Sequence, residues 1–225
     1  MKSWLILLSA NLIAAGLSSI AVCATPTTIL QTANYPVTGV LSGQGGFALL
    51  VSQFQFPAVR FTLTQATQIT AIGGNLVSNG STGNSEIFGA IAMTDASTTF
   101  PGALPTVFQP IAETTFIPPN SDAKDTIVPL SAILAPGNYA LIFGSGRFGA
   151  TGEGGMPFMS GDIGNPSYFI GQINDTTGAN QNWNNGDSNL HNIRFVVIGN
   201  VVPEPSTFAL AALGAVALLS VRRVS

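Results

Sequence analysis

The sequence predicts an all-β protein, an antiparallel β-sandwich flanked by two apolar terminal segments. Three observations lead to this prediction. Between residues 25 and 202 short apolar runs recur, and several of them alternate apolar with polar residues. Glycine, proline and asparagine turn signals separate these runs. No helical apolar period of useful length lies between them, whereas a parallel sheet would require alternating helices.

Residues 59–64 are the clearest strand candidate, because Val59, Phe61 and Leu63 alternate with polar residues. Residues 47–56 precede them and end in the same alternation. The other expected strands, in chain order, are residues 68–77, 87–93, 126–130, 139–143, 167–173 and 193–198. The expected turns are Pro57, Gly73-Gly74, Asn79-Gly80, Pro101-Gly102, Pro118-Pro119, Pro136-Gly137, residues 152–155 and Asn185-Gly186. Residues 144–164 are expected to form the longest irregular stretch.

The first 24 residues have the pattern of a secretory signal peptide. Lys2 supplies a short positive region, residues 5–21 are mostly apolar, and Val22-Cys23-Ala24 forms a small-residue cleavage site. Cleavage after Ala24 would remove Cys23, the single cysteine, and leave a mature chain without disulfides or thiol chemistry. The alternative is a lipoprotein in which Cys23 is acylated.

The C-terminal segment predicts a transmembrane helix at about residues 206–221. Pro203 and Pro205 exclude a helix interior before it. The apolar run would be about 24 Å long as a helix, slightly shorter than a bilayer core of about 30 Å. Arg222 and Arg223 can extend toward the headgroups, and the positive-inside rule places them in the cytoplasm and the preceding chain outside. The alternative is a core helix of a soluble domain.

Together, Pro203-Glu204-Pro205, the apolar run and Arg222-Arg223 resemble the PEP-CTERM sorting signal of bacteria. The resemblance implies an exported protein that the tail holds in the inner membrane and that an exosortase cleaves near the motif. The domain would lie outside the cytoplasm and then reach the cell surface or the exopolysaccharide layer. The implied organisation is a signal peptide at 1–24, an extracytoplasmic domain at 25–202 and a sorting and anchor segment at 203–225.

A second resemblance concerns the middle of the chain. The segments ATQITAIG at 66–73, IFGAI at 87–91, FPG at 100–102 and LAPGNYAL at 134–141 follow one another in this order. They resemble jelly-roll-like β-sandwich domains, grouped as choice-of-anchor domains, that occur in proteins with this type of anchor. The resemblance covers about half of the domain, and it implies a fold and a location without an established activity.

Composition excludes several functions. Between residues 25 and 202 carboxylates outnumber the cations Arg60, Lys124, Arg147 and Arg194, which argues against nucleic acid as a partner. His191 is the only histidine, so a His-rich metal centre is excluded, and no Gly-x-Ser-x-Gly nucleophile motif occurs. We therefore predict no catalytic residues, no metal ligands and no cofactor. A hydrolase would depend on a carboxylate pair whose separation the sequence does not give.

Four residues of the region between Gly144 and Leu190 are the ligand-binding candidates: Asp162, Asp175, Trp183 and Asp187. Trp183 lies among Asn, Gln and Asp, and an apolar ring beside amides suits a sugar. The alternative is a loop anchor folded onto the core, because large aromatic side chains bury well. The Asn and Asp oxygens at 174–175 and 184–189 suit Ca²⁺, but they lack the Asp-x-Asp-x-Asp-Gly loop, and a tight turn joining two strands is the favoured interpretation.

The sequence names no biochemical activity, and three hypotheses remain. The first is a non-enzymatic surface or matrix protein, the second a carbohydrate- or calcium-binding module, and the third a hydrolase. The position of Trp183 distinguishes the first two, since an exposed ring favours binding and a buried ring favours a scaffold. Two facing carboxylates in a groove would favour the third.

Overall fold

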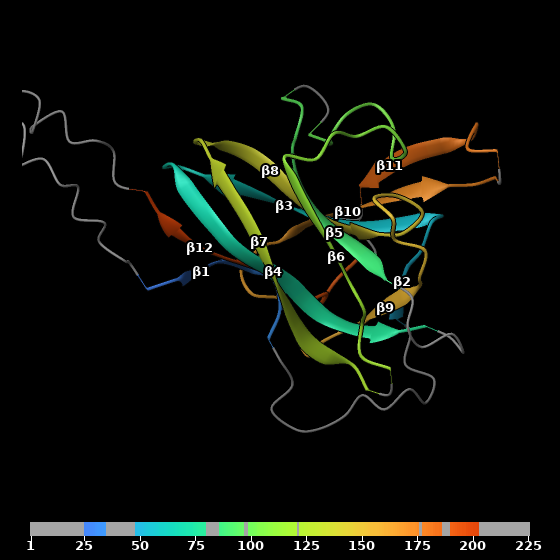
Figure 1. Cartoon of the computed structure of the whole chain (residues 1–225), viewed down its shortest axis with the longest axis horizontal. Helices are drawn as coiled ribbons and strands as arrows, with labels where there is room; N and C mark the ends of the chain where they lie inside the picture. Colours follow the sequence, from blue (N-terminus) through green and yellow to red (C-terminus); the bar gives the residue numbers. More distant parts are fainter. Residues whose placement is uncertain are drawn as a thin grey trace, which may run out of the picture.

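The computed structural model describes residues 25–34, 48–79, 86–96, 99–120, 122–175, 177–185 and 190–202. They form two antiparallel sheets packed as a sandwich, as predicted (Figure 1). The predicted signal peptide with Cys23, the helix at 206–221, the sorting residues from Pro203 onward and Asp187 lie outside the described residues. Within the described part of the chain, no helix has the length and apolar character needed to cross a membrane.

Each sheet contains six strands among the described residues. The first sheet consists of β1 (Thr27–Gln31), β12 (Phe195–Val201), β4 (Thr67–Ser78), β9 (Gly154–Pro157), β2 (Ala48–Val51) and β7 (Lys124–Leu134), the last pairing with β4. The second sheet runs in the order β11 (Gln181–Asn185), β10 (Ser167–Ile173), β3 (Gln55–Leu63), β8 (Gly137–Gly144), β5 (Ile87–Met93) and β6 (Ala112–Phe116).

All eight predicted strand regions contain strand, and the predicted bounds 87–93 and 167–173 coincide with β5 and β10. The expected single strand at 47–56 is wrong, because β2 ends at Val51 and β3 begins at Gln55. A bend separates the two strands, and within it the Phe54 backbone N–H donates to Ser52 Oγ at 3.1 Å. Pro57 was expected as a turn and lies inside β3, one residue before the pairing with β8 begins at Ala58.

The expected turn at Gly73-Gly74 is also wrong, because both glycines lie inside β4. β7 and β12 pair with the opposite edges of β4 at these residues. A Cβ atom at Gly73 would collide with the carbonyl oxygen of Thr126, and one at Gly74 with that of Arg194. The glycines therefore permit close approach of the neighbouring backbones and do not turn the chain.

The sequence did not predict β1, β6, β9 and β11, which are four or five residues long. β9 has the sequence Gly-Gly-Met-Pro and lies inside the stretch expected to be irregular. β11 has the polar sequence Gln-Asn-Trp-Asn-Asn and is held by pairing with β10. Strands this short have too little apolar alternation to be recognised, and their long-range partners define them.

The second sheet is buried on both faces. Toward the first sheet, Ile87 and Ile91 of β5 join the main core. On the opposite face Phe88 belongs to a second apolar cluster, which residues 99–110, here called the cover segment, help to enclose. This double burial explains why β5 is almost continuously apolar and does not alternate. The buried members of the second cluster are Phe56, Ala58, Phe88, Ala90, Ala92, Phe108, Ala140, Ile142, Ala150, Phe169 and Trp183.

An ion pair between the buried Arg194 and the more exposed Asp125 links β7 to the residue before β12. Arg194 Nε lies 2.9 Å from both carboxylate oxygens of Asp125, and its Nη2 lies 2.8 Å from Oδ2. Arg194 Nη1 donates to the Ala33 carbonyl oxygen, and Asn75 Nδ2 of β4 approaches Asp125 Oδ1 at 3.4 Å. The Arg194 side chain is 10% exposed and that of Asp125 30%. Asp125 therefore lies in place to neutralise the charge of Arg194.

Both described ends of the sandwich lie at the same end of the molecule (Figure 1). Thr27, near the first described residue, pairs with Gly199 of β12, and the Val202 backbone N–H donates to the Ala66 carbonyl oxygen. The turn between β10 and β11 lies at the opposite end, because β10 runs antiparallel to β3 and β3 ends next to Ala66. The chain therefore enters and leaves the sandwich on one side.

Candidate functional site

Trp183 lies in β11 with 8% of its surface exposed. Its ring meets Phe169 and Phe108 edge-on, at centroid distances of 5.3 and 6.0 Å, and it is stacked on Phe100 at 6.3 Å. Its indole nitrogen is buried and has no hydrogen-bond partner among the described residues. This position fits the alternative in which Trp183 anchors its segment to the core. A sugar could stack on the ring only after the cover segment had moved.

Two arginines fasten the cover segment to the second sheet. Arg60 Nε donates to the Thr99 carbonyl oxygen at 2.7 Å. Arg147 Nη2 donates to the Phe108 carbonyl oxygen at 2.8 Å, and its guanidinium lies 4.3 Å from the centroid of the Phe108 ring. Burial lowers the pKa of Arg147, and the negative charge of Glu113 acts in the opposite direction. Both arginines are thus engaged in holding the fold.

Asp162, another predicted ligand-binding residue, joins its loop to neighbouring strands. Asp162 Oδ1 accepts from the Asn192 backbone N–H at 2.7 Å, and the Tyr168 hydroxyl lies 2.7 Å from the same atom. That hydroxyl also lies 2.8 Å from the Ile193 carbonyl oxygen, so either oxygen can accept its single proton. Burial, followed by the bond to Asp162, raises the pKa of Tyr168. His191, with a 60% exposed side chain, approaches Asp162 at 3.8 Å.

Asp175, the third predicted residue, closes the turn between β10 and β11. Its Oδ1 accepts from the Thr177 hydroxyl at 2.7 Å and from the backbone N–H groups of Thr177 and Ala179. Its Oδ2 accepts from the Asn180 backbone N–H at 2.9 Å. The hydrogen bond from the Thr177 hydroxyl, helped by these backbone donors, lowers the pKa of Asp175. This carboxylate is a turn-forming group.

The turn held by Asp175 is expected to loosen in acid. Because the folded pKa lies below the ordinary value of 3.8, the stabilisation is complete above that value. It is lost as the pH falls through the lowered pKa. Amide chemical shifts of Thr177, Ala179 and Asn180, followed from pH 7 to 2, should report the opening. Asp175→Asn, which cannot titrate at this position, should abolish the transition, and an unchanged transition in that variant would assign it to another group.

The described ligand-binding candidates do not form one site. Asp162 bonds the start of the segment leading into β12, Asp175 closes the β10–β11 turn, and Trp183 lies beneath the cover segment. Asp187 lies outside the described residues. Within the described ranges no group of three or more His, Cys, Asp or Glu side chains is placed to hold a metal ion. Asp125, Asp162 and Asp175 have structural contacts that account for their positions.

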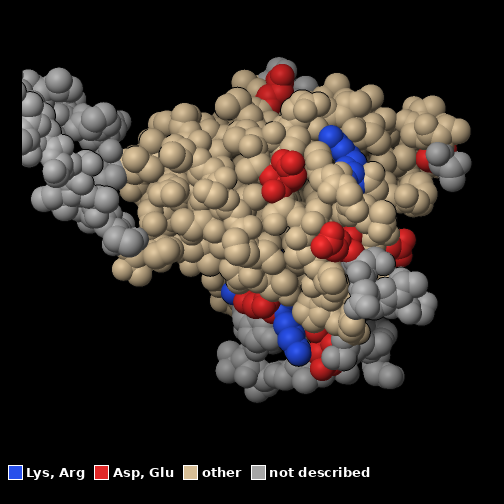
Figure 2. Space-filling model, viewed as in Figure 1, with Lys and Arg blue, Asp and Glu red and all other residues tan. Residues whose placement is uncertain are grey.

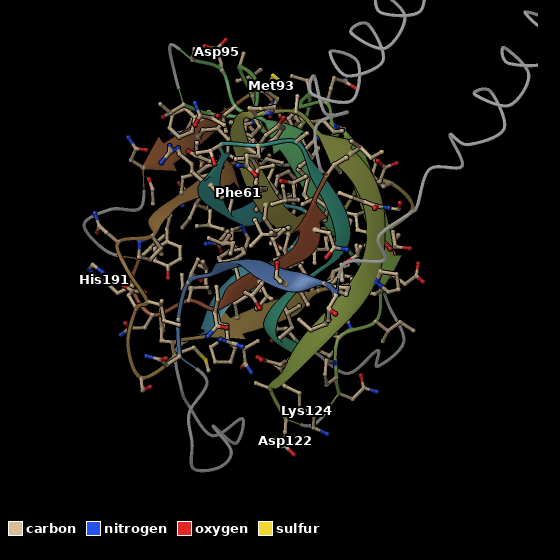
Figure 3. The ribbon with its side chains drawn as sticks, turned by 90° about the vertical axis from the view of Figure 1, so that its left-hand side faces the viewer. Phe61, Met93, Asp95, Asp122, Lys124 and His191 are labelled. Carbon is tan, nitrogen blue, oxygen red and sulfur yellow. The ribbon has the colours of Figure 1, made fainter. Side chains whose placement is uncertain are left out.

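A half-open cavity with a volume of about 530 Å³ is lined by described residues of both sheets. β1 of the first sheet forms one wall, and β3 and β8 of the second sheet form the other. Figure 3 looks toward this side, with Phe61 near the centre of the view and Asp95 at its upper rim. The lining residues are Leu30, Gln31, Thr32, Arg60, Phe61, Thr62, Thr94, Asp95, Ala96, Thr99, Asn138, Ile163, Asn165, Pro166 and Ser167.

Sequence reasoning missed this cavity. It placed Phe61 correctly on the buried face of a strand, but it had no means of bringing residues 94–99 and 163–167 to the same opening. A possible signal was Arg60, a charged residue within an otherwise uncharged strand. Its guanidinium bonds Thr99, Ser167 and Asn185, and it thereby joins the segments around the cavity.

The described fold and surface define an all-β sandwich protein with few charges. Figure 2 shows one face that is mostly uncharged, with basic and acidic side chains side by side at its lower edge. Residues 201–224 match the PEP-CTERM protein-sorting motif, which confirms the resemblance of the C-terminal segment. The motif implies an exported, membrane- or surface-associated protein that an exosortase processes. A search of curated proteins finds no match for the chain.

Proposed function

We propose that the protein is a non-enzymatic component of the cell surface or extracellular matrix. In this proposal the leader directs export, the helix at 206–221 tethers the chain to the inner membrane, and an exosortase then releases it near Pro203-Glu204-Pro205. The observation that carries the proposal is the sorting motif at residues 201–224. The sandwich supports it, because Asp125, Asp162 and Asp175 serve turns and strand contacts.

The positions of the two described chain ends suit a sandwich that is tethered to the membrane at one end. Since the chain enters and leaves the sandwich on the same side, a tail that begins after Val202 would hold that side nearest the membrane. The β10–β11 turn and Phe54, which is 38% exposed, would then face outward. A jelly-roll-like sandwich in this position is a spacer or a building block of a surface layer.

A binding role is the second candidate, and the cavity between β1 and β3 favours it. Its volume of about 530 Å³ falls within the range of about 300–1,000 Å³ typical of small-molecule sites. In this second proposal the ligand is a carbohydrate. Calcium and hydrolysis rank lower, because among the described residues Asp95 is the only carboxylate that lines the cavity.

The sorting proposal predicts a mass and a location. Replacing Pro203, Glu204 and Pro205 by alanine should leave the chain in the membrane fraction with its tail attached. The unaltered protein should appear at the surface or in the medium with a mass that ends near the motif. Cell fractionation with intact mass measurement tests this. Ser225→Ala, which lies outside the matched residues 201–224, is the control.

Release of the triple-alanine protein at the same site would contradict exosortase recognition of the motif. The same masses also fix the N-terminus. A start at Thr25 supports signal-peptide cleavage, whereas an acylated Cys23 would establish the lipoprotein alternative.

A further inference from the structure

We propose that the cavity between β1 and β3 binds a neutral saccharide of one or two rings. This inference rests on the binding role, the second proposed function, and does not depend on how the tail is processed. Its basis is the combination of apolar side chains, uncharged hydrogen-bonding side chains and two residues of opposite charge in the lining of one half-open cavity. Each of these features selects against a different class of ligand.

Part of the cavity lining is apolar. Leu30 and Phe61 belong to the two sheets, and Ile163 and Pro166 to the segment before β10. Phe61 is 8% exposed and also belongs to the main core. Sugar rings present C–H faces that pack on such a surface, whereas a fully hydrated ion gains nothing from it.

The rim carries side chains that can both donate and accept hydrogen bonds. Asn138 Oδ1 accepts from the Thr62 hydroxyl at 2.7 Å, which leaves both amide N–H groups of Asn138 for a ligand. The Asn165 side chain is exposed and makes no hydrogen bond to the described residues. Gln31 adds a third amide from β1. Paired donors and acceptors at several positions match vicinal hydroxyl groups.

The charges of the lining select against ions. Arg60 and Asp95 are the only charged residue types in the described part of the cavity wall, and they have opposite signs. The guanidinium of Arg60 donates to Thr99, Ser167 and Asn185 and lies 4.6 Å from the centroid of the Phe169 ring. It is therefore committed to protein contacts and does not form an anion clamp. A single carboxylate provides too few ligands for Ca²⁺, which takes six to eight oxygens.

The test is equilibrium binding of defined oligosaccharides to the full chain purified in detergent. The panel contains neutral mono- and disaccharides of glucose, galactose and N-acetylglucosamine, with uronic-acid mono- and disaccharides as charged counterparts. We expect at least one neutral member to bind in the micromolar to millimolar range, and the uronic acids to bind more weakly.

Three variants locate the site. Asn138→Ala with Asn165→Ala should weaken binding at least about tenfold, since two hydrogen bonds are removed. Asn165→Trp should abolish binding by filling the opening, and its thermal unfolding shows whether the fold is retained. Asn120→Ala, an exposed amide outside the cavity lining, should leave the affinity unchanged.

Two results would overturn the inference. One is the absence of binding by every neutral saccharide to a folded chain, and the other is binding that survives Asn165→Trp or favours the uronic acids. Neither result tests the sorting proposal, which depends only on the mass and the location of the protein in cells. Conversely, an unprocessed tail in cells would leave the binding measurement valid.

Discussion

Replacing Trp183 by alanine is expected to lower the free energy of unfolding by about 3–5 kcal/mol, the range for large aromatic side chains truncated in a core. The ring is buried beneath the cover segment and touches Phe100, Phe108 and Phe169. Its loss leaves a cavity between that segment and β10, and the covering aromatic rings lose their partner. Gly171 of β10 lies against the ring and has no side chain that could extend into the space.

Urea unfolding followed by far-ultraviolet circular dichroism measures this change. Trp183→Phe keeps an aromatic ring in the cluster and should lose clearly less stability than the alanine variant. Asn182→Ala, the exposed neighbour in β11, is the matched control and should stay within about 0.5 kcal/mol. A loss of less than about 1 kcal/mol in Trp183→Ala, together with lost saccharide binding, would contradict the anchor position and restore Trp183 as a ligand-binding residue.

Replacing Asp125 by alanine is expected to destabilise the protein by about 3 kcal/mol. Removing one partner of a buried ion pair costs about 3–5 kcal/mol, because the other charge remains in the interior. The lower end of that range applies here, since the Asp125 side chain is 30% exposed and water can partly replace it. Arg194, at 10% exposure, has no comparable access.

A double-mutant cycle separates the pair from the rest of the fold. Arg194→Met removes the buried charge, so Asp125→Ala in that background should cost much less than it does alone. Asp122→Ala is the matched control, because Asp122 lies just before β7 and has no ion pair among the described residues; it points away from the ribbon in Figure 3. Additive effects of Asp125→Ala and Arg194→Met would show that the two residues contribute independently.

Alternation and turn chemistry predicted the strands that carry the main core. Val59, Phe61 and Leu63 face the first sheet, as their spacing indicated. The same reasoning misjudged Gly73-Gly74 and Pro57, because glycine and proline mark turns in isolation and can also serve inside a strand. At Gly73 the deciding fact is the approach of the Thr126 backbone, which belongs to a strand about fifty residues away in the chain.

For the candidate site, too, the sequence supplied the residues and the structure supplied their roles. The sequence identified Asp162, Asp175 and Trp183 as unusual, and each has a distinct set of contacts in the structure. It could not tell a ligand-binding side chain from a turn-forming or anchoring one, because that depends on which partner the fold supplies. For Trp183 the partner is the cover segment, about eighty residues earlier in the chain.

By itself, the sequence determined the all-β class, most of the strands and the sorting motif at the C-terminus, because these depend on local periodicity and on residues that are contiguous. Only the tertiary structure decided that the second sheet is buried on both faces, that Trp183 is covered and that Arg194 is paired with Asp125. It alone placed Leu30, Phe61, Asn138 and Asn165 around one cavity. The physical reason is that burial and pairing arise between segments far apart in the chain, and their partners are fixed only when the sheets pack.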